Sequence, residues 1–163
     1  MIKDFLKITN PTKVLELGTG MGAISLLIKD VLPSVKLLTI DRKPYPEHEI
    51  LFMNGIVPLY ADIHDADKIM FGEVANLFIQ HPGTTLVLCD NGRKIDEFIY
   101  LSQFLKIGDY IMAHDYSVNR ETRVWDFNPE ICDADIREAC EMYNLKDFYN
   151  DFKGMAWVCK VKL

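Results

Sequence analysis

The chain of 163 residues lacks the features that mark several specialised classes of protein. No apolar run approaches the roughly 18 residues that span a bilayer, and the opening "MIKDFLKITNP" mixes charged with apolar residues, unlike a signal peptide. Basic residues are not in excess: the formal net charge of −6 argues against nucleic acid, because proteins that grip phosphates usually present a positive face. We therefore expect no membrane partner, no nucleic-acid partner and a cytoplasmic location.

Cysteine is also scarce, with four residues and no C-x-x-C pair. Cys89 and Cys159 lie inside apolar runs, so buried thiols are expected there rather than a metal or redox centre. The sequence shows no internal repeat, low-complexity tract or linker. Its length suits one domain with a substantial core, and we expect a single domain over residues 1–163.

What the sequence does contain is a regular alternation of short apolar runs with segments of helical period. The predicted strands are 13–18, 35–40, 57–61, 84–89 and 109–114, with two late strands at 145–149 and 155–163. The predicted helices are 22–32, 46–54, 65–80, 95–105 and 133–143, and the span 116–130 is predicted to be irregular. Such alternation builds a parallel sheet covered by helices on both faces. The predicted fold is therefore α/β, a Rossmann-like doubly wound sheet.

Polar residues stand where four of these predicted strands end. Three strands end at Asp41, Asp62 and Asp90, and the fifth ends at His114-Asp115. Ligands of open α/β sheets bind outside the carboxyl ends of the strands, so we expect these side chains to gather along one rim. A single Asp in such a place can instead cap the next helix, and for Asp62 this alternative stays open.

The first predicted strand ends in a glycine turn, "VLELGTGMGA", which contains Gly18, Gly20 and Gly22. Glycines allow the backbone to turn tightly and to approach a ligand closely, and the next helix offers free N–H groups to a carboxylate or phosphate. Asp41 follows Gly22 by 19 residues, and a carboxylate at that strand end can accept hydrogen bonds from both hydroxyls of a ribose. The pattern indicates a nucleoside ligand, and it suits NAD as well as an adenosyl cofactor.

In order along the chain, "VLELGTGMG", "LLTIDRKP", "YADIHD", "LVLCDNG" and "FLKIGDYIMAHDY" resemble the motifs of class I S-adenosylmethionine-dependent methyltransferases, over about residues 12–116. The tail "FYNDFKGMAWVCKVKL" resembles the antiparallel strands that close that family's sheet. The resemblance implies an enzyme with S-adenosyl-L-methionine as cofactor and a mostly parallel, seven-stranded sheet with an antiparallel C-terminal strand. It also implies a set of cofactor-binding residues: Glu16, Gly18, Thr19, Gly20, Gly22, Asp41, Arg42, Asp62, Ile63 and Asp90.

The tips of the fourth and fifth predicted strands suggest a metal site. Neighbouring strands lie about 4.8 Å apart, so Asp90 and Asp115 should converge, and two close carboxylates repel unless a cation lies between them. The pattern resembles metal-dependent O-methyltransferases, of the catechol type and of the cephalosporin-hydroxylase-like group that modifies sugars and antibiotics. The resemblance implies a divalent metal, Mg²⁺ or Mn²⁺, on Asp90, His114 and Asp115. His114 departs from the catechol pattern, and imidazole suits Mn²⁺, Fe²⁺ or Zn²⁺ better than Mg²⁺.

The implied reaction is O-methylation of a small hydroxylated acceptor such as a sugar or polyol. His114 or Lys94 would take the hydroxyl proton; His114 is alternatively a metal ligand or a core histidine, and Lys94 a solvated side chain. The span 117–136 is the candidate substrate-facing loop, with an ordinary packed loop as the alternative. Its aromatic and guanidinium side chains are Arg120, Arg123, Trp125 and Phe127.

Other classes of function stay open at this point. A NAD-dependent dehydrogenase shares the glycine turn and Asp41, but it would need a substrate domain and does not explain acids after strands four and five. A module that binds the cofactor without turnover is a second alternative, and a homo-oligomer is one way to complete a shallow substrate pocket. Base N-methylation is disfavoured, because "CDNGRK" replaces the Asn/Asp-Pro-Pro-Tyr/Phe motif after the fourth strand.

Overall fold

The computed structural model describes residues 1–64, 68–121 and 130–163. Its helices are α1 (Ile2–Thr9), α2 (Ala23–Val31), α3 (His48–Met53), α4 (Lys68–Gln80), α5 (Lys94–Ser102), α6 (Asp133–Met142) and the 3₁₀ helix η1 (Asn150–Met155). Its strands are β1 (Lys13–Leu17), β2 (Lys36–Asp41), β3 (Leu59–Tyr60), β4 (Thr85–Cys89), β5 (Tyr110–His114), β6 (Tyr116–Ser117), β7 (Ile131–Cys132), β8 (Leu145–Asp147) and β9 (Trp157–Lys162). Among the described residues, no helix is long and apolar enough to cross a membrane.

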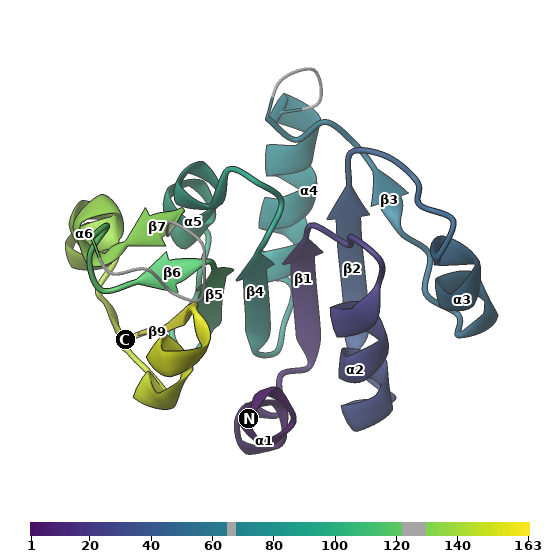
Figure 1. Ribbon diagram of the computed structural model, residues 1–163, viewed down its shortest axis with the longest axis horizontal. Helices are drawn as coiled ribbons and strands as arrows, with labels where there is room; N and C mark the ends of the chain where they lie inside the picture. The colour runs from purple at the N-terminus through teal and green to yellow at the C-terminus, as the bar shows by residue number, and fades with distance from the viewer. Residues whose placement is uncertain (65–67, 122–129) are drawn as a thin grey trace.

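Seven strands form one sheet in the order β3-β2-β1-β4-β5-β9-β8 (Figure 1). The first five in this order pair in parallel, whereas β9 runs antiparallel to both β5 and β8. The predicted Rossmann-like, mostly parallel sheet with an antiparallel C-terminal strand is therefore confirmed. The chain moves outward from β1 to β3 on one side and from β4 to β5 on the other. The strand order reverses between β1 and β4, which is where such sheets bind their ligands.

The sheet separates two hydrophobic cores, and the strand residues alternate between them. In β4, Val87 and Cys89 belong to the core beneath α4, α5 and α6, whereas Leu86 and Leu88 belong to the core beneath α1, α2 and η1. This period of two follows from the pleat of a strand. Because both faces are covered, the strands read as unbroken apolar runs in the sequence. Cys89 and Cys159 are buried free thiols, as expected.

The structure differs from the predicted elements in four places. The predictions contain no helix at the N-terminus, where α1 buries Phe5 and Leu6; Ile2, Phe5 and Leu6 stand at helical spacing, so the periodic signal was present and was missed. The strand predicted at 57–61 is only the two residues of β3, preceded by Pro58, which has no N–H to donate. The span predicted as irregular holds β6, which pairs with β7 in a small parallel sheet. Between β8 and β9, the chain forms η1.

The remaining predicted elements are present with ends displaced by a few residues. The helix predicted at 65–80 is described from Lys68 onward as α4, and residues 65–67 lie outside the described part of the chain. Helix α3, predicted at 46–54, lies beside the β3 edge of the sheet (Figure 1). Its residues His48 and Leu51 lie next to the glycine turn.

Candidate active site

The glycine turn after β1 packs directly against the tip of β4. Gly18 has a φ of +90°, and a Cβ at this position would lie 2.3 Å from the backbone oxygen of Asp90. The backbone N–H of Asp90 donates to the carbonyl of Leu17 at 2.9 Å. Only glycine combines this φ with so close an approach. The turn and the first acidic strand tip therefore form a single packed unit.

A cavity of about 630 Å³ lies at the reversal of strand order between β1 and β4. Within it, Asp41 Oδ2 accepts the N–H of Gly20 at 2.9 Å, and Oδ1 accepts the N–H of Lys43 at 3.4 Å. A carboxylate oxygen can accept more than one hydrogen bond, so Asp41 retains capacity for ribose hydroxyls. The lining residues are Gly18, Gly20, Asp41, Arg42, Lys43, Tyr45, Asp90, Asn91 and Gly92.

Three of the predicted cofactor residues do not line the cavity but stabilise the glycine turn. Glu16 is only 2 % exposed and accepts a hydrogen bond from the Ser25 hydroxyl; burial raises the pKa of this carboxyl to about 7. The Thr19 hydroxyl lies 2.6 Å from that of Thr39, and Gly22 precedes α2 with a left-handed φ of 85°. These residues shape the turn that the cavity uses.

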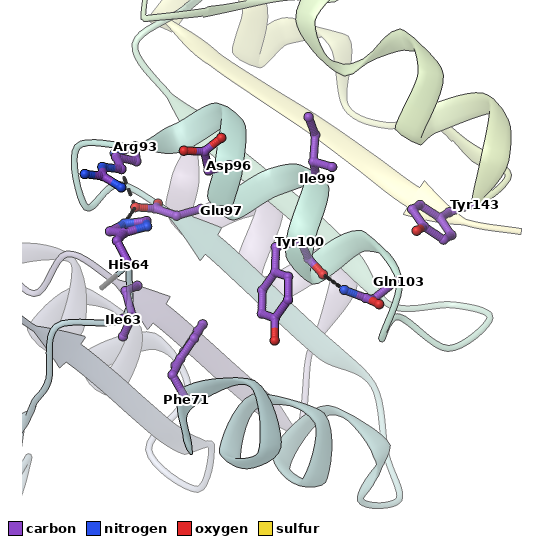
Figure 2. Close-up of a pocket in the computed structure, with 10 residues that line it drawn as sticks. All are labelled: Ile63, His64, Phe71, Arg93, Asp96, Glu97, Ile99, Tyr100, Gln103 and Tyr143. Atoms are coloured by element: carbon purple, nitrogen blue, oxygen red, sulfur yellow. Dashed lines mark hydrogen bonds and ion pairs between the residues drawn. The ribbon is translucent and has the colours of Figure 1, made fainter. Parts of the chain in front are cut away.

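The last two predicted cofactor residues follow β3. Asp62 Oδ1 accepts the N–H of His64 at 3.3 Å, which stabilises the turn after the strand. Ile63 lines a second cavity of about 350 Å³, together with Phe71 of α4 and Tyr100 of α5 (Figure 2). The structure thus brings Gly18, Gly20, Asp41, Arg42 and Asp90 to the first cavity, and Ile63 to the second.

Glu97 of α5 connects the loops that flank these two cavities. Its Oε1 lies 3.1 Å from Nε2 of His64 and accepts the N–H of Arg93 at 3.4 Å (Figure 2). Its Oε2 accepts the N–H of Asn91 at 3.3 Å. Burial raises the pKa of Glu97, while these hydrogen bonds favour the carboxylate. One buried carboxylate therefore holds the loop after β4 and joins it to the loop after β3.

Asp90, His114 and Asp115 meet at the tips of β4 and β5. One ligand atom from each lies within 4.8 Å of the others. Consecutive residues of a strand normally point to opposite faces, yet His114 and Asp115 both reach this point. Asp115 has a φ of 55°, in the left-handed region that Asp tolerates better than most residues. This bend directly after β5 allows both side chains to meet Asp90.

Lys94, the first residue of α5, lies among the acidic side chains. Its Nζ lies 2.9 Å from Asp115 Oδ2, 3.4 Å from Asp90 Oδ1 and 2.8 Å from Glu130 Oε2, and the side chain is 5 % exposed. Burial alone would lower the pKa of Lys94, but the hydrogen bonds with Glu130 and Asp115 and the charge of Asp90 outweigh it and raise the pKa. Lys94 is therefore an ammonium group in this arrangement.

His114 faces the same carboxylates from β5. Its Nδ1 lies 3.5 Å from Asp90 Oδ1 and 3.4 Å from Asp115 Oδ1. The hydrogen bond with Asp90 raises the pKa of His114, and burial opposes this shift in part. The ring packs at 4.6 Å against Trp157 of β9, and the side chain is 36 % exposed. This environment is accessible and acidic, unlike that of a core histidine.

The cluster fits a divalent cation by charge and by donor type. Three carboxylates, from Asp90, Asp115 and Glu130, surround one ammonium group, which leaves an excess of two negative charges. Two carboxylates with one imidazole form a donor set that suits Mn²⁺, Fe²⁺ or Zn²⁺. The neighbouring cavity also fits a polar ligand, because the buried Nδ2 of Asn91, which lines it, has no partner among the described residues.

The sequence did not indicate the role of every residue in this cluster. Glu130 was included only within the predicted substrate loop, and nothing in its sequence context indicates the partnership with Lys94. Arg120 of that loop donates to Asp135 at 2.8 Å, and this hydrogen bond raises the pKa of Arg120. Three other side chains of the loop lie outside the described residues: Arg123, Trp125 and Phe127.

No protein-family model and no curated protein matches this sequence. Solved methyltransferase structures do resemble the fold. Human N-acetylserotonin methyltransferase, in complex with SAM, is 12% identical with a TM-score of 0.56, over 99% of this chain and 50% of that one. The O-methyltransferase TomG from Streptomyces achromogenes, also with SAM, is 14% identical with a TM-score of 0.59, over 99% and 77%. PigF with SAH is 12% identical with a TM-score of 0.55, over 95% and 57%.

These structures assign the chain to a class of fold. It is the fold of class I S-adenosylmethionine-dependent methyltransferases, as the sequence motifs imply. The chain spans about half the length of the human methyltransferase.

Proposed function

We propose that the protein is an S-adenosylmethionine-dependent methyltransferase that methylates a hydroxyl oxygen of a small acceptor with the help of a divalent cation. One observation carries the proposal: Asp90 belongs both to the acidic cluster and to the lining of the cavity at the glycine turn. Methyl transfer is an in-line displacement, so the acceptor oxygen and the methyl carbon must be held in contact. A residue shared by the two sites supports such an arrangement.

The cofactor half of the site supports a nucleoside. S-adenosylmethionine would supply a methyl group on a sulfonium sulfur. Asp41 would accept hydrogen bonds from the ribose hydroxyls, with its orientation already set by the N–H groups of Gly20 and Lys43. The unpartnered amide nitrogen of Asn91 would donate to an acceptor atom of the ligand. Gly18 keeps the turn tightly packed on the tip of β4.

The acceptor half of the site supports activation of a hydroxyl group. A divalent cation held by Asp90 and Asp115 would bind the hydroxyl of a sugar or polyol and lower its pKa. Lys94 is an ammonium group with three carboxylate partners; it orients the acids, so we assign proton transfer to His114 rather than to Lys94. His114 is alternatively the third metal ligand, and the variant His114→Gln separates these roles. Loss of Mn²⁺ affinity identifies a ligand, whereas loss of turnover with Mn²⁺ affinity retained identifies a base.

Calorimetric titration with S-adenosylhomocysteine, NAD and Mn²⁺ tests the proposal. We expect S-adenosylhomocysteine to bind and NAD not to bind; the reverse result would favour the dehydrogenase. Asp90→Asn and Asp115→Asn should abolish Mn²⁺ binding, and Asp96→Asn, which removes an exposed carboxylate of α5 that is not part of the cluster, should leave it intact. Full activity of an Asp90→Ala/Asp115→Ala variant in the presence of a chelator would rule out the metal.

The cofactor-binding module without turnover is tested separately. Wild-type protein with S-adenosylmethionine and Mn²⁺ is incubated with a panel of sugars, polyols and catechols, and release of S-adenosylhomocysteine is measured. Binding of the cofactor without release on any hydroxylated acceptor would favour the module. Completion of the acceptor pocket by a second copy of the chain stays a prediction.

A further inference from the structure

His48, the first residue of α3, is a buried histidine that lies outside both halves of the proposed site. His48 is only 1 % exposed, and both of its ring nitrogens have hydrogen-bond partners. Nε2 lies 2.8 Å from the carbonyl oxygen of Gly20, and Nδ1 lies 2.8 Å from the hydroxyl of Tyr60. The N–H of Tyr45 also donates to Nδ1 at 3.5 Å. His48 therefore contacts the glycine turn, the loop after β2 and strand β3.

These partners determine where the ring carries its proton. A carbonyl oxygen only accepts and a backbone N–H only donates, so Nε2 must donate to Gly20 and Nδ1 must accept from Tyr45. The Tyr60 hydroxyl then donates to Nδ1. In the opposite tautomer, an unprotonated Nε2 would face the Gly20 carbonyl oxygen, and a protonated Nδ1 would face the Tyr45 N–H. With hydrogen on Nε2 the ring donates to Gly20, and the single lone pair of Nδ1 is shared by the Tyr60 hydroxyl at 2.8 Å and the more distant Tyr45 N–H at 3.5 Å.

The hydrogen bond from His48 acts on the one glycine of the turn that packing does not hold. A Cβ on Gly18 or Gly22 would collide with neighbouring atoms, but a Cβ on Gly20 would meet nothing within 4 Å, and its φ is 51°. A turn hydrogen bond from the Gly22 N–H to the Thr19 carbonyl at 2.8 Å encloses Gly20, and the polar groups of Gly20 itself are held by two further hydrogen bonds. Its carbonyl accepts from His48, and its N–H donates to Asp41 Oδ2 at 2.9 Å.

We propose that His48 is a positioning residue for the nucleoside: it holds Gly20 in the orientation that presents Asp41 to the ribose. If Gly20 turned, its N–H would leave Asp41, and that carboxylate would lose the hydrogen bond that orients it in the cavity. Tyr45, which lines the same cavity, is held by His48 through its backbone. The identity of the ligand rests on the proposed function, whereas the ordering of the turn is a property of the free protein.

Two amide variants separate the donor from the bulk of the side chain. The amide nitrogen of glutamine reaches the place of Nε2, whereas that of asparagine reaches only the place of Nδ1. We expect His48→Asn to weaken binding of S-adenosylhomocysteine about tenfold, the effect of one lost hydrogen bond, and His48→Gln to bind within about twofold of wild type. Tyr60→Phe leaves the bond to Gly20 in place and should bind like His48→Gln. His81→Asn, at an exposed histidine remote from the cavity, is the matched control.

Nuclear magnetic resonance of the ligand-free protein tests the same inference without a ligand. We expect faster hydrogen exchange at the Gly20 amide in His48→Asn and wild-type exchange in His48→Gln, with ring ¹⁵N shifts of wild type showing hydrogen on Nε2. Equal weakening by His48→Asn and His48→Gln, or unchanged Gly20 exchange in His48→Asn, would overturn the positioning role. If wild type binds no S-adenosylhomocysteine, the proposed function fails, and the exchange data still decide whether His48 orders the turn.

Discussion

Replacement of Lys94 by methionine is the sharpest test of the acidic cluster. Methionine keeps much of the length and apolar contact of the lysine stem and removes only the ammonium group. The carboxylates of Asp90, Asp115 and Glu130 then lose their shared cation, which now lies within 3.4 Å of each. The excess of negative charge at this point rises from two to three. We expect Lys94→Met to be less stable than wild type and to bind divalent cations more tightly.

The magnitude follows from how deeply each partner is buried. Loss of one partner from a buried ion pair typically costs about 3–5 kcal/mol. The Lys94 side chain is 5 % exposed, but those of Asp90, Asp115 and Glu130 are 31%, 34% and 50% exposed, so water screens part of their repulsion. We therefore expect a loss of about 2 kcal/mol. For a chain of 163 residues, such a loss lowers the melting temperature by roughly 4–8 °C.

Thermal unfolding with a chelator, and then with Mn²⁺, measures both effects. Lys3→Met is the control: Lys3 pairs with Asp30 at 3.0 Å, but both side chains are exposed, so the expected loss is below about 0.5 kcal/mol. Mn²⁺ should raise the melting temperature of Lys94→Met more than that of wild type. If Lys94→Met melts within about a degree of wild type in chelator, or responds to Mn²⁺ less than wild type does, our account of the cluster is wrong.

Three further variants test the surroundings of the site. Burial raises the pKa of Glu16 from 4.5 to about 7, so the folded state binds more protons than the unfolded state in this window and stability falls as pH rises through it. Urea unfolding should show Glu16→Gln gaining about 3 kcal/mol relative to wild type between about pH 4 and pH 8; a constant difference would contradict this. Gly18→Ala should cost about 3 kcal/mol, because its Cβ meets the backbone of Asp90 at a left-handed φ, and wild-type stability would refute that packing. Glu97→Leu should lower the free energy of unfolding in urea by about 2–3 kcal/mol, because the N–H groups of Asn91 and Arg93 and the His64 ring lose their hydrogen-bond partner. Glu97→Gln should lose less, and equal losses in the two variants would contradict the account.

The fold was accessible from sequence because its signals are local. Each strand is a short apolar run, each helix has its own period, and the polar residue that ends a strand follows it directly in the chain. The edge strand β3 and helix α1 were the weak points. Pro58 precedes the first, which is only two residues long and has a weak pattern, whereas α1 has Ile2, Phe5 and Leu6 at helical spacing and could have been predicted.

The candidate site was accessible in part. The carboxyl ends of parallel strands share one edge, so the grouping of Asp90, His114 and Asp115 follows from strand order. The role of Lys94 was not accessible, because its partner Glu130 is 36 residues away along the chain. The same holds for His48, which lies 28 residues from Gly20. Residue type indicates that a side chain can donate or accept, but it does not identify the partner.

The sequence by itself determined the parallel sheet, the glycine turn and the acids at the strand tips, because each depends on neighbours along the chain and on the alternation of apolar residues. Tertiary structure alone decided that Asp115 adopts a left-handed backbone conformation, that one ammonium group serves three carboxylates, and that a histidine of α3 contacts the carbonyl of Gly20. These features depend on distances of a few ångströms between segments that packing brings together, and such distances are not encoded in any local pattern.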